Sequence, residues 1–426
     1  MSIAFGGFLL LLASGMPIVF ALGVAALLAI VMLTDVPLVI VAQRIYGGVD
    51  SFSLLAIPFF VTAGILMAEG GIARRFVDLA VALVGWITGS LYLVTIVTGT
   101  GLAAISGSGS ADTAAVGSIL APEMRKRGYD IDLAASIIAA SGALAPIIPP
   151  SIIMVVIAIT SQLSVGAMFL GGVVPGCLIA LALSVTCWLI AKRGGSVYQD
   201  TEPFSLLRLR LAFVAAIPGL TLPVIIVGGI VGGLFTATEA ACVAVIVAAA
   251  ISLFGYREIV FNDLPRLMLR SISLSAAVMI IISTASVFSW IIASLGAPKL
   301  LDLWIRSVTD SSIVFLMLVN VLLLILGMFM ESISVILIIM PVLMPIALSF
   351  GIDPVHFGVM VGLNLSIGLI TPPYGICLYI SAMVSGRTVE QVSRRIWIPL
   401  IPMIIVLLLS SYVPSVILTL PRMFFP

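Results

Sequence analysis

Long apolar runs constrain the fold of this chain more than any other feature of its sequence. The runs Ile3–Leu33, Leu211–Ile230 and Ile396–Leu420 reach or exceed the roughly 20 apolar residues that a helix needs to cross a bilayer. Only 9% of the 426 residues are charged, whereas a soluble domain has about a quarter. The runs do not alternate between apolar and polar residues, as the strands of a membrane β-barrel do. The sequence therefore predicts an all-α polytopic membrane protein embedded in the lipid bilayer.

The first of these runs, Ile3–Leu33, lies close to the N-terminus. It is longer than the apolar core of a signal peptide, and it has neither a basic segment before it nor a cleavage site after it. We therefore expect this run to be a retained membrane span.

Two segments of the chain resemble each other and indicate an internal repeat. Arg127–Ile152 is similar to Phe350–Gly375, and one constant offset aligns Gly128 with Gly351, Pro122 with Pro345, Pro149–Pro150 with Pro372–Pro373, Ser108 with Glu331, and Ser141 with Asn364. Such duplication is typical of secondary transporters. The longest polar interruption falls between the copies, so we divide the chain into a first half (1–190), a cytoplasmic linker (191–210) and a second half (211–426).

The distribution of basic residues predicts that the two halves are inverted. The loop at 125–127 is basic, whereas its counterpart Ala347–Asp353 contains no base. One helix later the difference reverses, because Ser161–Gly166 has no base and Ser385–Arg395 contains several. Short loops rich in Lys and Arg stay in the cytoplasm. Equivalent loops are therefore expected on opposite sides of the membrane.

Four polar or proline-rich segments interrupt the apolar helices at matched places. Ile105–Thr113 and Gly327–Ser334 are predicted to be the tips of two re-entrant helical hairpins, over 98–124 and 328–347. Ser141–Ser151 and Asn364–Gly375 are predicted to be the unwound centres of two broken helices, over 131–161 and 356–384, because paired prolines remove backbone donors. Unwound backbone at membrane depth must be buried in protein or line a wet cavity. Paired interruptions therefore predict a binding site.

The interrupted segments offer oxygen atoms, which hard cations such as Na⁺ prefer. The candidate oxygens are the carbonyls near 145–148 and 368–371 and the side chains of Ser106, Ser108, Ser110, Asn364, Ser366 and Thr371. A half-helix that begins near Asp112 directs its positive end toward the site, which suits an anion. The candidate substrate-binding residues are Asp112, Ser141, Glu331, Asn364 and Ser366.

Structural roles are alternatives for several of these residues. Intramembrane carboxylates are functional by default, but Asp112 could cap its half-helix, and Glu331 could make a hydrogen bond at the helix tip. The glycines and serines of the first tip could serve close helix packing. In Gly232–Ala241 a capping arrangement predicts Thr236 or Thr238 as the N-cap and a structural role for Glu239.

Other classes of function lack the residues that they need. The chain has a single histidine, His356, four cysteines without metal-type spacing, and none of the sequence signatures of metalloproteases or serine hydrolases. It also lacks a Walker-type glycine loop, so neither an enzyme nor an ATP-driven pump is expected, and no cofactor is expected besides Na⁺ as a coupling ion. The net charge of +1 carries no information about nucleic acid, but no soluble domain is long enough to bind one, so no nucleic-acid partner is expected. A passive channel is an alternative, and a measurement of uptake against a gradient would exclude it.

Two charged stretches and one isolated base remain. Gly70–Asp78 and Tyr256–Arg270 mix charged with apolar residues and are predicted to be interfacial helices. Arg44 and the neighbouring Gln43 lie near the end of a span, where they are expected to reach toward the interface or to meet an anionic substrate.

The chain resembles the large membrane subunit of TRAP (tripartite ATP-independent periplasmic) transporters, the DctM-like family. The resemblance runs through "SGSGSADTAAVGSILAPEM", "APIIPPSI", "GLFTATEAA", "MPVLMPIA", "GIDPVHFGVM" and "NLSIGLITPPYG", and so covers nearly the whole chain. It implies an elevator-type, ion-transporter-superfamily fold in the bacterial cytoplasmic (inner) membrane. It also implies Na⁺-coupled import of an organic carboxylate, with sialic acids, C4-dicarboxylates and sugar acids left open.

The resemblance further implies partners and ion ligands. The partners are a small four-span membrane subunit and a periplasmic substrate-binding protein. One Na⁺ site would lie near Ser106, Ser108 and the carbonyls of Ala145, Ile148 and Pro149, with Ser110 as an alternative ligand, and a second would involve Gly327, Gly368 and Thr371. The alternative function is a self-sufficient Na⁺/dicarboxylate symporter that needs no binding protein.

Overall fold

The computed structural model describes residues 2–34, 36–199 and 203–425, and within these ranges every regular element is helical. The helices of the first half are α1 (Ser2–Ala13), α2 (Ile18–Leu33), α3 (Val39–Val49), η1 (Phe52–Leu55), α4 (Ala56–Glu69), α5 (Ile72–Val84), α6 (Ser90–Ser106), α7 (Gly109–Lys126), α8 (Ile131–Gly142), α9 (Ile152–Thr160) and α10 (Val165–Arg193).

The short helix η2 (Ser196–Gln199) follows α10. The remaining helices are α11 (Leu206–Val231), α12 (Ala237–Ala250), η3 (Ile251–Gly255), η4 (Phe261–Asp263), α13 (Leu264–Ser294), α14 (Ala297–Val308), α15 (Ser312–Phe329), α16 (Ser332–Ser349), α17 (Pro354–Gly368), α18 (Ile376–Ser385), α19 (Val389–Arg395), α20 (Trp397–Tyr412) and α21 (Ser415–Phe424).

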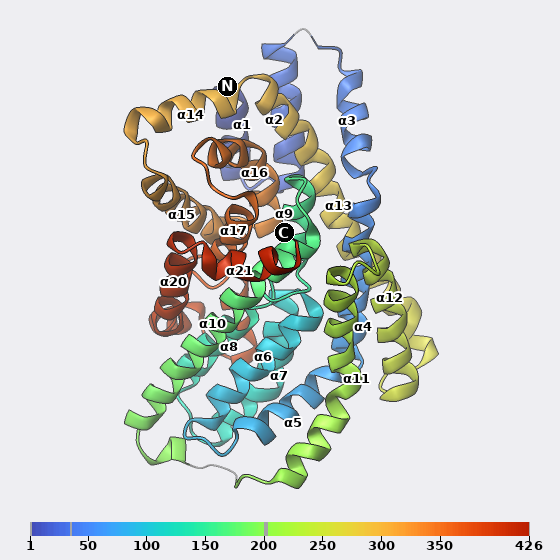
Figure 1. Cartoon of the computed structure of the whole chain (residues 1–426), viewed down its shortest axis with the longest axis vertical. Coiled ribbons are helices and arrows are strands. Elements are labelled where there is room, and N and C mark those ends of the chain that lie inside the picture. Colours follow the sequence, from blue (N-terminus) through green and yellow to red (C-terminus); the bar gives the residue numbers. More distant parts are fainter. Residues whose placement is uncertain (1, 35, 200–202, 426) are drawn as a thin grey trace.

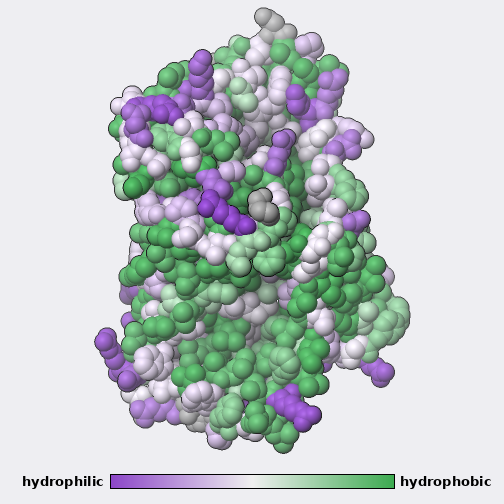
Figure 2. All heavy atoms as spheres, viewed as in Figure 1, coloured by the Kyte–Doolittle hydropathy of each residue, from purple (hydrophilic) through white to green (hydrophobic). Residues whose placement is uncertain are grey.

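The helices are those of an integral membrane protein, as predicted. Among the described residues, 7 helices are long and apolar enough to cross a membrane, or up to 8 if the bent pair α19 and α20 is one span. Apolar side chains cover much of the visible face, and hydrophilic side chains gather mainly toward its upper and lower ends (Figure 2). Large exposed apolar residues are stable in this arrangement because lipid, rather than water, surrounds them.

The two halves use equivalent helices and interlock. In the first half α6 and α7 precede the pair α8 and α9, and in the second half α15 and α16 precede α17 and α18. α7 packs against α18, and α16 packs against α9, so each half contacts the broken helix of the other. α6, α7 and α8 lie in the lower part of the molecule and α15, α16 and α17 in the upper part (Figure 1).

Ion pairs place the two basic loops together. Arg387 bonds to Asp132 at 2.8 Å and Arg395 to Asp130 at 3.2 Å, so the loop after α7 lies against the loop after α18. The base-free counterparts instead lie near the C-terminal end of the chain, where Asp353 pairs with Arg422 at 3.7 Å. Equivalent loops are thus separated and the two basic loops are adjacent, in agreement with the predicted inversion.

A second group of helices packs beside these interlocked pairs. α4 packs against α12, α5 against α11, and α13 against both α2 and α3. α13 also packs along α16, where the Ser289 hydroxyl donates to the Leu337 carbonyl at 2.8 Å. This carbonyl is free because Pro341, four residues later, has no N–H to donate to it. The contact joins the second group to the interlocked pairs.

The arms of the two tips differ from the predicted hairpin ranges. The range 328–347 contains only the end of α15 and most of α16, so it is too short for both helices of a hairpin. The two helices that meet at the second tip are the whole of α15 and α16. The prolines at 341 and 345 remain inside α16. At the first tip α6 begins at Ser90, earlier than the predicted boundary at 98.

Three further predictions need correction. The run Ile3–Leu33 is two helices rather than one, because the chain turns at Gly15, whose φ is +83°, before Pro17. Tyr256–Arg270 is not a separate interfacial helix, since it contains η4 and the start of α13, whereas α14 and α21 are amphipathic helices of the second half. In the predicted linker, α10 continues to Arg193 and α11 begins at Leu206, while 200–202 lie outside the described residues.

Candidate functional site

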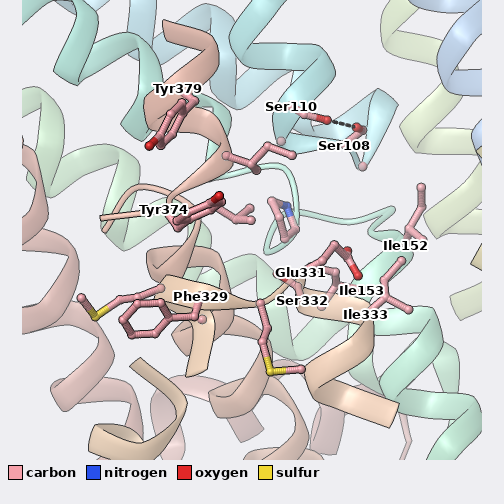
Figure 3. Close-up of a pocket in the computed structure, with 18 residues that line it drawn as sticks. Ser108, Ser110, Ile152, Ile153, Phe329, Glu331, Ser332, Ile333, Tyr374 and Tyr379 are labelled. Atoms are coloured by element: carbon pink, nitrogen blue, oxygen red, sulfur yellow. Dashed lines mark hydrogen bonds between the residues drawn. The ribbon is translucent and has the colours of Figure 1, made fainter. Parts of the chain in front are cut away.

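A cavity of about 440 Å³ lies where the two tips meet the two proline breaks. All four segments that the sequence singled out contribute to its wall, from opposite sides (Figure 3). Its lining residues are Gly107, Ser108, Gly109, Ser110, Pro146, Ile152, Ile153, Gly327, Met328, Phe329, Met330, Glu331, Ser332, Ile333, Leu369, Tyr374, Ile376 and Tyr379. Segments far apart in the sequence therefore form one site.

Four helix N-termini converge on this cavity. The first residues of α7, α9, α16 and α18, which are Gly109, Ile152, Ser332 and Ile376, all line it. Each N-terminus carries unpaired N–H groups and about half a positive charge from the helix dipole. Among the residues that the structure describes, no Lys or Arg lines the cavity, and Glu331 is its single charged residue. The positive potential at this site therefore comes from backbone rather than from side chains.

The first tip turns at Gly107 and Ser108. Gly107 has a φ of +61°, and a Cβ placed on it would lie 2.7 Å from the Pro150 carbonyl oxygen. Glycine is therefore required, both for the left-handed conformation and for the close approach to the first proline break. The hydroxyls of Ser108 and Ser110 lie 3.3 Å apart at the cavity wall (Figure 3).

Asp112 lies just behind this tip and is buried. Its Oδ1 accepts a hydrogen bond of 2.5 Å from the Ser106 hydroxyl, and its Oδ2 has no partner. The structure shows no capping hydrogen bond from a side chain at the start of α7, so Asp112 is not the helix cap considered above. Ser106 is therefore engaged with Asp112 rather than directed into the cavity.

At the second tip Glu331 is the N-cap of α16. Its carboxylate accepts a hydrogen bond from the Ser334 backbone N–H at 3.1 Å, which confirms the hydrogen bond at the helix tip. The same side chain lines the cavity (Figure 3). Nearby, α15 and α17 touch through backbone at Gly327 and Gly368, since a Cβ on Gly368 would lie 2.8 Å from the Gly327 Cα.

The paired prolines at the centres of the two breaks do not line the cavity. Ala145, Ile148 and Pro149 are buried, and Pro146 is the residue of this break that reaches the cavity. In the second break the Thr371 hydroxyl donates to the Ile367 carbonyl at 2.8 Å, and Thr371 does not line the cavity. These predicted ion ligands therefore lie beside the cavity rather than in its wall.

Three predicted substrate-binding residues also lie outside the wall. Ser141 and Ser366 donate to carbonyls of their own helices, at 2.8 Å to Ile138 and 2.9 Å to Gly362. Asn364 is fully buried, and its amide donates to the backbone and side-chain oxygens of Asn320. Only Asn364 joins two helices, while Ser141 and Ser366 bond within their own helices. A substrate contact for these three residues stays a prediction.

Two tyrosines were missed by the sequence reasoning. Tyr374 and Tyr379 lie on the wall opposite the first tip, with ring centroids 5.8 Å apart (Figure 3). Tyr374 directly follows the second Pro-Pro pair and Tyr379 lies in the first turns of α18. The sequence signal for Tyr374 was its position immediately after a helix break. A side chain at that position no longer belongs to the helix that has ended, so it does not pack with the buried face of that helix.

The capping arrangement in the second half is confirmed with Thr236 as the N-cap. Its hydroxyl accepts from the Glu239 N–H at 3.3 Å, and the Glu239 carboxylate accepts from the Thr236 N–H at 2.8 Å. Glu239 therefore has the structural role predicted for it. No group of three or more potential metal-binding His, Cys, Asp or Glu side chains occurs within the described ranges.

Interlocked broken helices around a central cavity, within a membrane-spanning helical bundle, define a transport protein. The chain matches, over residues 5–416, the family described as "Tripartite ATP-independent periplasmic transporter, DctM component". It belongs to this family. It is a multi-pass permease of the bacterial inner membrane, and its relatives are transporter subunits rather than enzymes.

Similar proteins extend along almost the whole chain. The C4-dicarboxylate TRAP transporter large permease protein DctM of Rhodobacter capsulatus is 38% identical over 435 residues, covering 99% of this chain and 98% of that protein. The isethionate TRAP transporter permease protein DctMQ of Oleidesulfovibrio alaskensis is 40% identical over 416 residues, covering 97% of this chain but only 65% of that protein.

The fold is also found in a solved transporter structure. The YdaH transporter of Alcanivorax borkumensis superimposes with a TM-score of 0.61 at 13% identity, covering 89% of each chain. At this identity the likeness concerns the fold alone.

Proposed function

We propose that the chain is the permease of a Na⁺-coupled importer of small organic anions, most simply carboxylates, which it receives from a periplasmic binding protein. The observation that carries this proposal is the cavity itself. Four helix N-termini line it, yet no basic side chain does so within the described ranges. Helix dipoles favour an anion, but Glu331 opposes one, so additional positive charge is needed for tight binding.

Sodium ions supply that charge in our proposal. The C-terminal ends of α6, α15 and α17 lie beside the cavity and offer carbonyl oxygens, which attract cations. The close approach at Gly107 places the Pro150 carbonyl oxygen beside the first tip, and the close approach at Gly368 places the Gly327 carbonyl oxygen beside the second break. One ion would bind near Ser106, Ser108 and the first break, and the second near Gly327, Gly368 and Thr371.

The substrate class follows from the cavity and the relatives. A cavity of about 440 Å³ falls within the range of about 300–1,000 Å³ for small-molecule sites. The two relatives are named for C4-dicarboxylate and for isethionate. The shared chemistry is a small organic acid in its anionic form, and we expect the same of this chain's substrate, with Asp112, Glu331 and the tip serines positioned around it.

The partners in this proposal are a small membrane subunit and a periplasmic binding protein. The family description names this chain as one component of a tripartite transporter. The permease protein named DctMQ is longer than this chain, which covers only 65% of it. We infer that the additional part corresponds to the small subunit, which this chain would bind as a separate protein.

Movement of the substrate would occur by an elevator mechanism. The interlocked pairs α6–α9 and α15–α18 carry the cavity and would move as a body against the group formed by α2–α5 and α11–α13. The contact between α13 and α16, which includes the Ser289 hydrogen bond, would then have to slide.

Uptake into proteoliposomes tests the function. The permease and its small subunit are reconstituted, and accumulation of labelled succinate or isethionate is compared with Na⁺ or K⁺ outside, with and without the transporter's own binding protein. We expect accumulation against a gradient only with Na⁺ and the binding protein. Equal uptake in K⁺ contradicts the coupling, and full uptake without the binding protein favours a self-sufficient symporter.

A further inference from the structure

A second cavity lies between the two groups of helices. It is separate from the cavity between the tips and the proline breaks, which is called the transport cavity below. It has a volume of about 490 Å³ and is walled by α3 and α13 on one side and by α9 and α16 on the other. These four helices lie near one another in the upper part of the molecule (Figure 1). Its polar lining residues are Arg44, Thr160, Gln162, Ser286 and Ser289.

Arg44 gives this cavity a charge that the transport cavity lacks. Its guanidinium lies over the Trp290 ring, 5.2 Å from the ring centroid, and stacking of this kind orients the planar donor group. No Asp or Glu lines the cavity, and no acidic side chain pairs with Arg44 in the part of the chain that the structure describes. An oriented guanidinium without a carboxylate partner is a ready donor for an anion.

The surrounding residues complete a site of the right chemistry. The hydroxyl of Ser286 and the amide of Gln162 can donate further hydrogen bonds to anionic oxygens. The hydroxyls of Ser289 and Thr160 already donate to the Leu337 and Val156 carbonyls. Gly48 packs against α13 so closely that a Cβ on it would lie 2.6 Å from the Ser286 Cβ. This contact keeps α3, which carries Arg44, against the helix that carries Trp290.

One short helix, α9, contributes to the walls of both cavities. α9 lines the transport cavity with Ile152 and Ile153 at its N-terminus and lines the second cavity with Ile159 and Thr160 at its C-terminus. Nine residues of helix span about 14 Å. Gln162 follows in the base-free loop Ser161–Gly166, which the charge distribution places outside the cytoplasm. The second cavity therefore lies on the side from which an imported substrate arrives.

We propose that the Arg44 cavity is a second anion-binding site, which takes a carboxylate, sulfonate or phosphate group before the transport cavity does. The proposal rests on the proposed function for the identity of the anion as a transported acid and for the order in which the two cavities are occupied; the site itself requires only the guanidinium and its neighbours. A lipid phosphate could present the same chemistry as a free organic acid.

Trp290 reports occupancy of the site. The full-length permease with its small subunit is placed in phosphatidylcholine nanodiscs without Na⁺, after the other four tryptophans are replaced by phenylalanine. Titration with succinate, isethionate or inorganic phosphate is expected to change Trp290 emission saturably. Arg44→Gln is expected to weaken the titration at least about tenfold, as for loss of a charge-assisted contact, and Arg44→Lys to retain part of it. Lys299→Gln, which removes a base outside the cavity, is the matched control.

The result distinguishes a free organic acid from a lipid phosphate as the occupant. It also distinguishes failure of the Arg44 site from failure of the proposed transport function. If adding phosphatidylglycerol changes the emission and flattens the succinate titration, the site is confirmed with lipid as its occupant. If no probe and no anionic lipid changes the emission, or if Arg44→Gln titrates like the wild type, the site is refuted. Because this titration needs no Na⁺, it can succeed even if Na⁺-driven uptake fails, and it can fail while uptake succeeds.

Discussion

The backbone contact between Gly327 and Gly368 makes a quantitative prediction. In Gly368→Ala the new Cβ would lie 2.8 Å from the Gly327 Cα and 2.9 Å from the carbonyl carbon and oxygen of the same residue. Carbon atoms pack comfortably at about 3.5–4.0 Å, so α15 and α17 must separate by about 0.7 Å. Main-chain atoms of two helices cannot rotate away as a flexible side chain can. Overpacking of this kind costs about 1–3 kcal/mol.

The same displacement would disturb the proposed second Na⁺ site. Metal–ligand distances tolerate about 0.2 Å, so a shift of about 0.7 Å should raise the Na⁺ concentration for half-maximal uptake at least about tenfold. Gly327→Ala should have a smaller effect, since its Cβ would lie 3.2 Å from the nearest backbone atom. The assays are thermal unfolding in nanodiscs and Na⁺-dependent uptake into proteoliposomes.

Gly228→Ala is the matched control for this substitution. Gly228 lies in α11, and a Cβ on it would meet nothing within 4 Å. Alanine is the better helix former by about 1 kcal/mol, so this variant should be unchanged or slightly stabilised. If Gly368→Ala unfolds and responds to Na⁺ as Gly228→Ala does, the argument from the helix contact is refuted.

Three further substitutions probe individual hydrogen bonds through thermal unfolding. Ser106→Ala leaves the buried Asp112 carboxylate without its partner and should cost about 1–3 kcal/mol; no loss would show that the bond does not stabilise the fold. Thr236→Ala removes a helix cap, and a loss of about 1 kcal/mol with normal Na⁺ dependence is expected; an altered Na⁺ dependence contradicts a purely structural role. Ser289→Ala should cost about 0.5–1.5 kcal/mol of stability in the otherwise wild-type protein. In a Pro341→Ala background it should cost less, because the new N–H at position 341 donates to the free Leu337 carbonyl; an equal cost in both backgrounds would contradict this.

The sequence determined those parts of the site that depend on local chemistry. Paired prolines at 149–150 and 372–373 interrupt a helix wherever it packs, because they lack N–H groups. The glycine–serine run around Gly107 and the capping box at Thr236 likewise work within a few residues. Residue order alone is therefore enough to locate these features, and the folded chain brings both tips and both breaks to one cavity.

Tertiary structure alone decided which side chains face that cavity. Asn364 and Ser141 occupy matched positions in the repeat, yet both are buried among helices, whereas Tyr374 and Tyr379 face the cavity. The sequence pattern also did not predict that Ser106 bonds to Asp112, or that α15 and α16 meet at Glu331. The physical reason is that lipid and protein interior are equally apolar, so hydropathy does not tell a helix face that meets lipid from one that meets another helix. Only the packing of the helices assigns Arg44 to a cavity wall and Asn364 to a buried contact with Asn320.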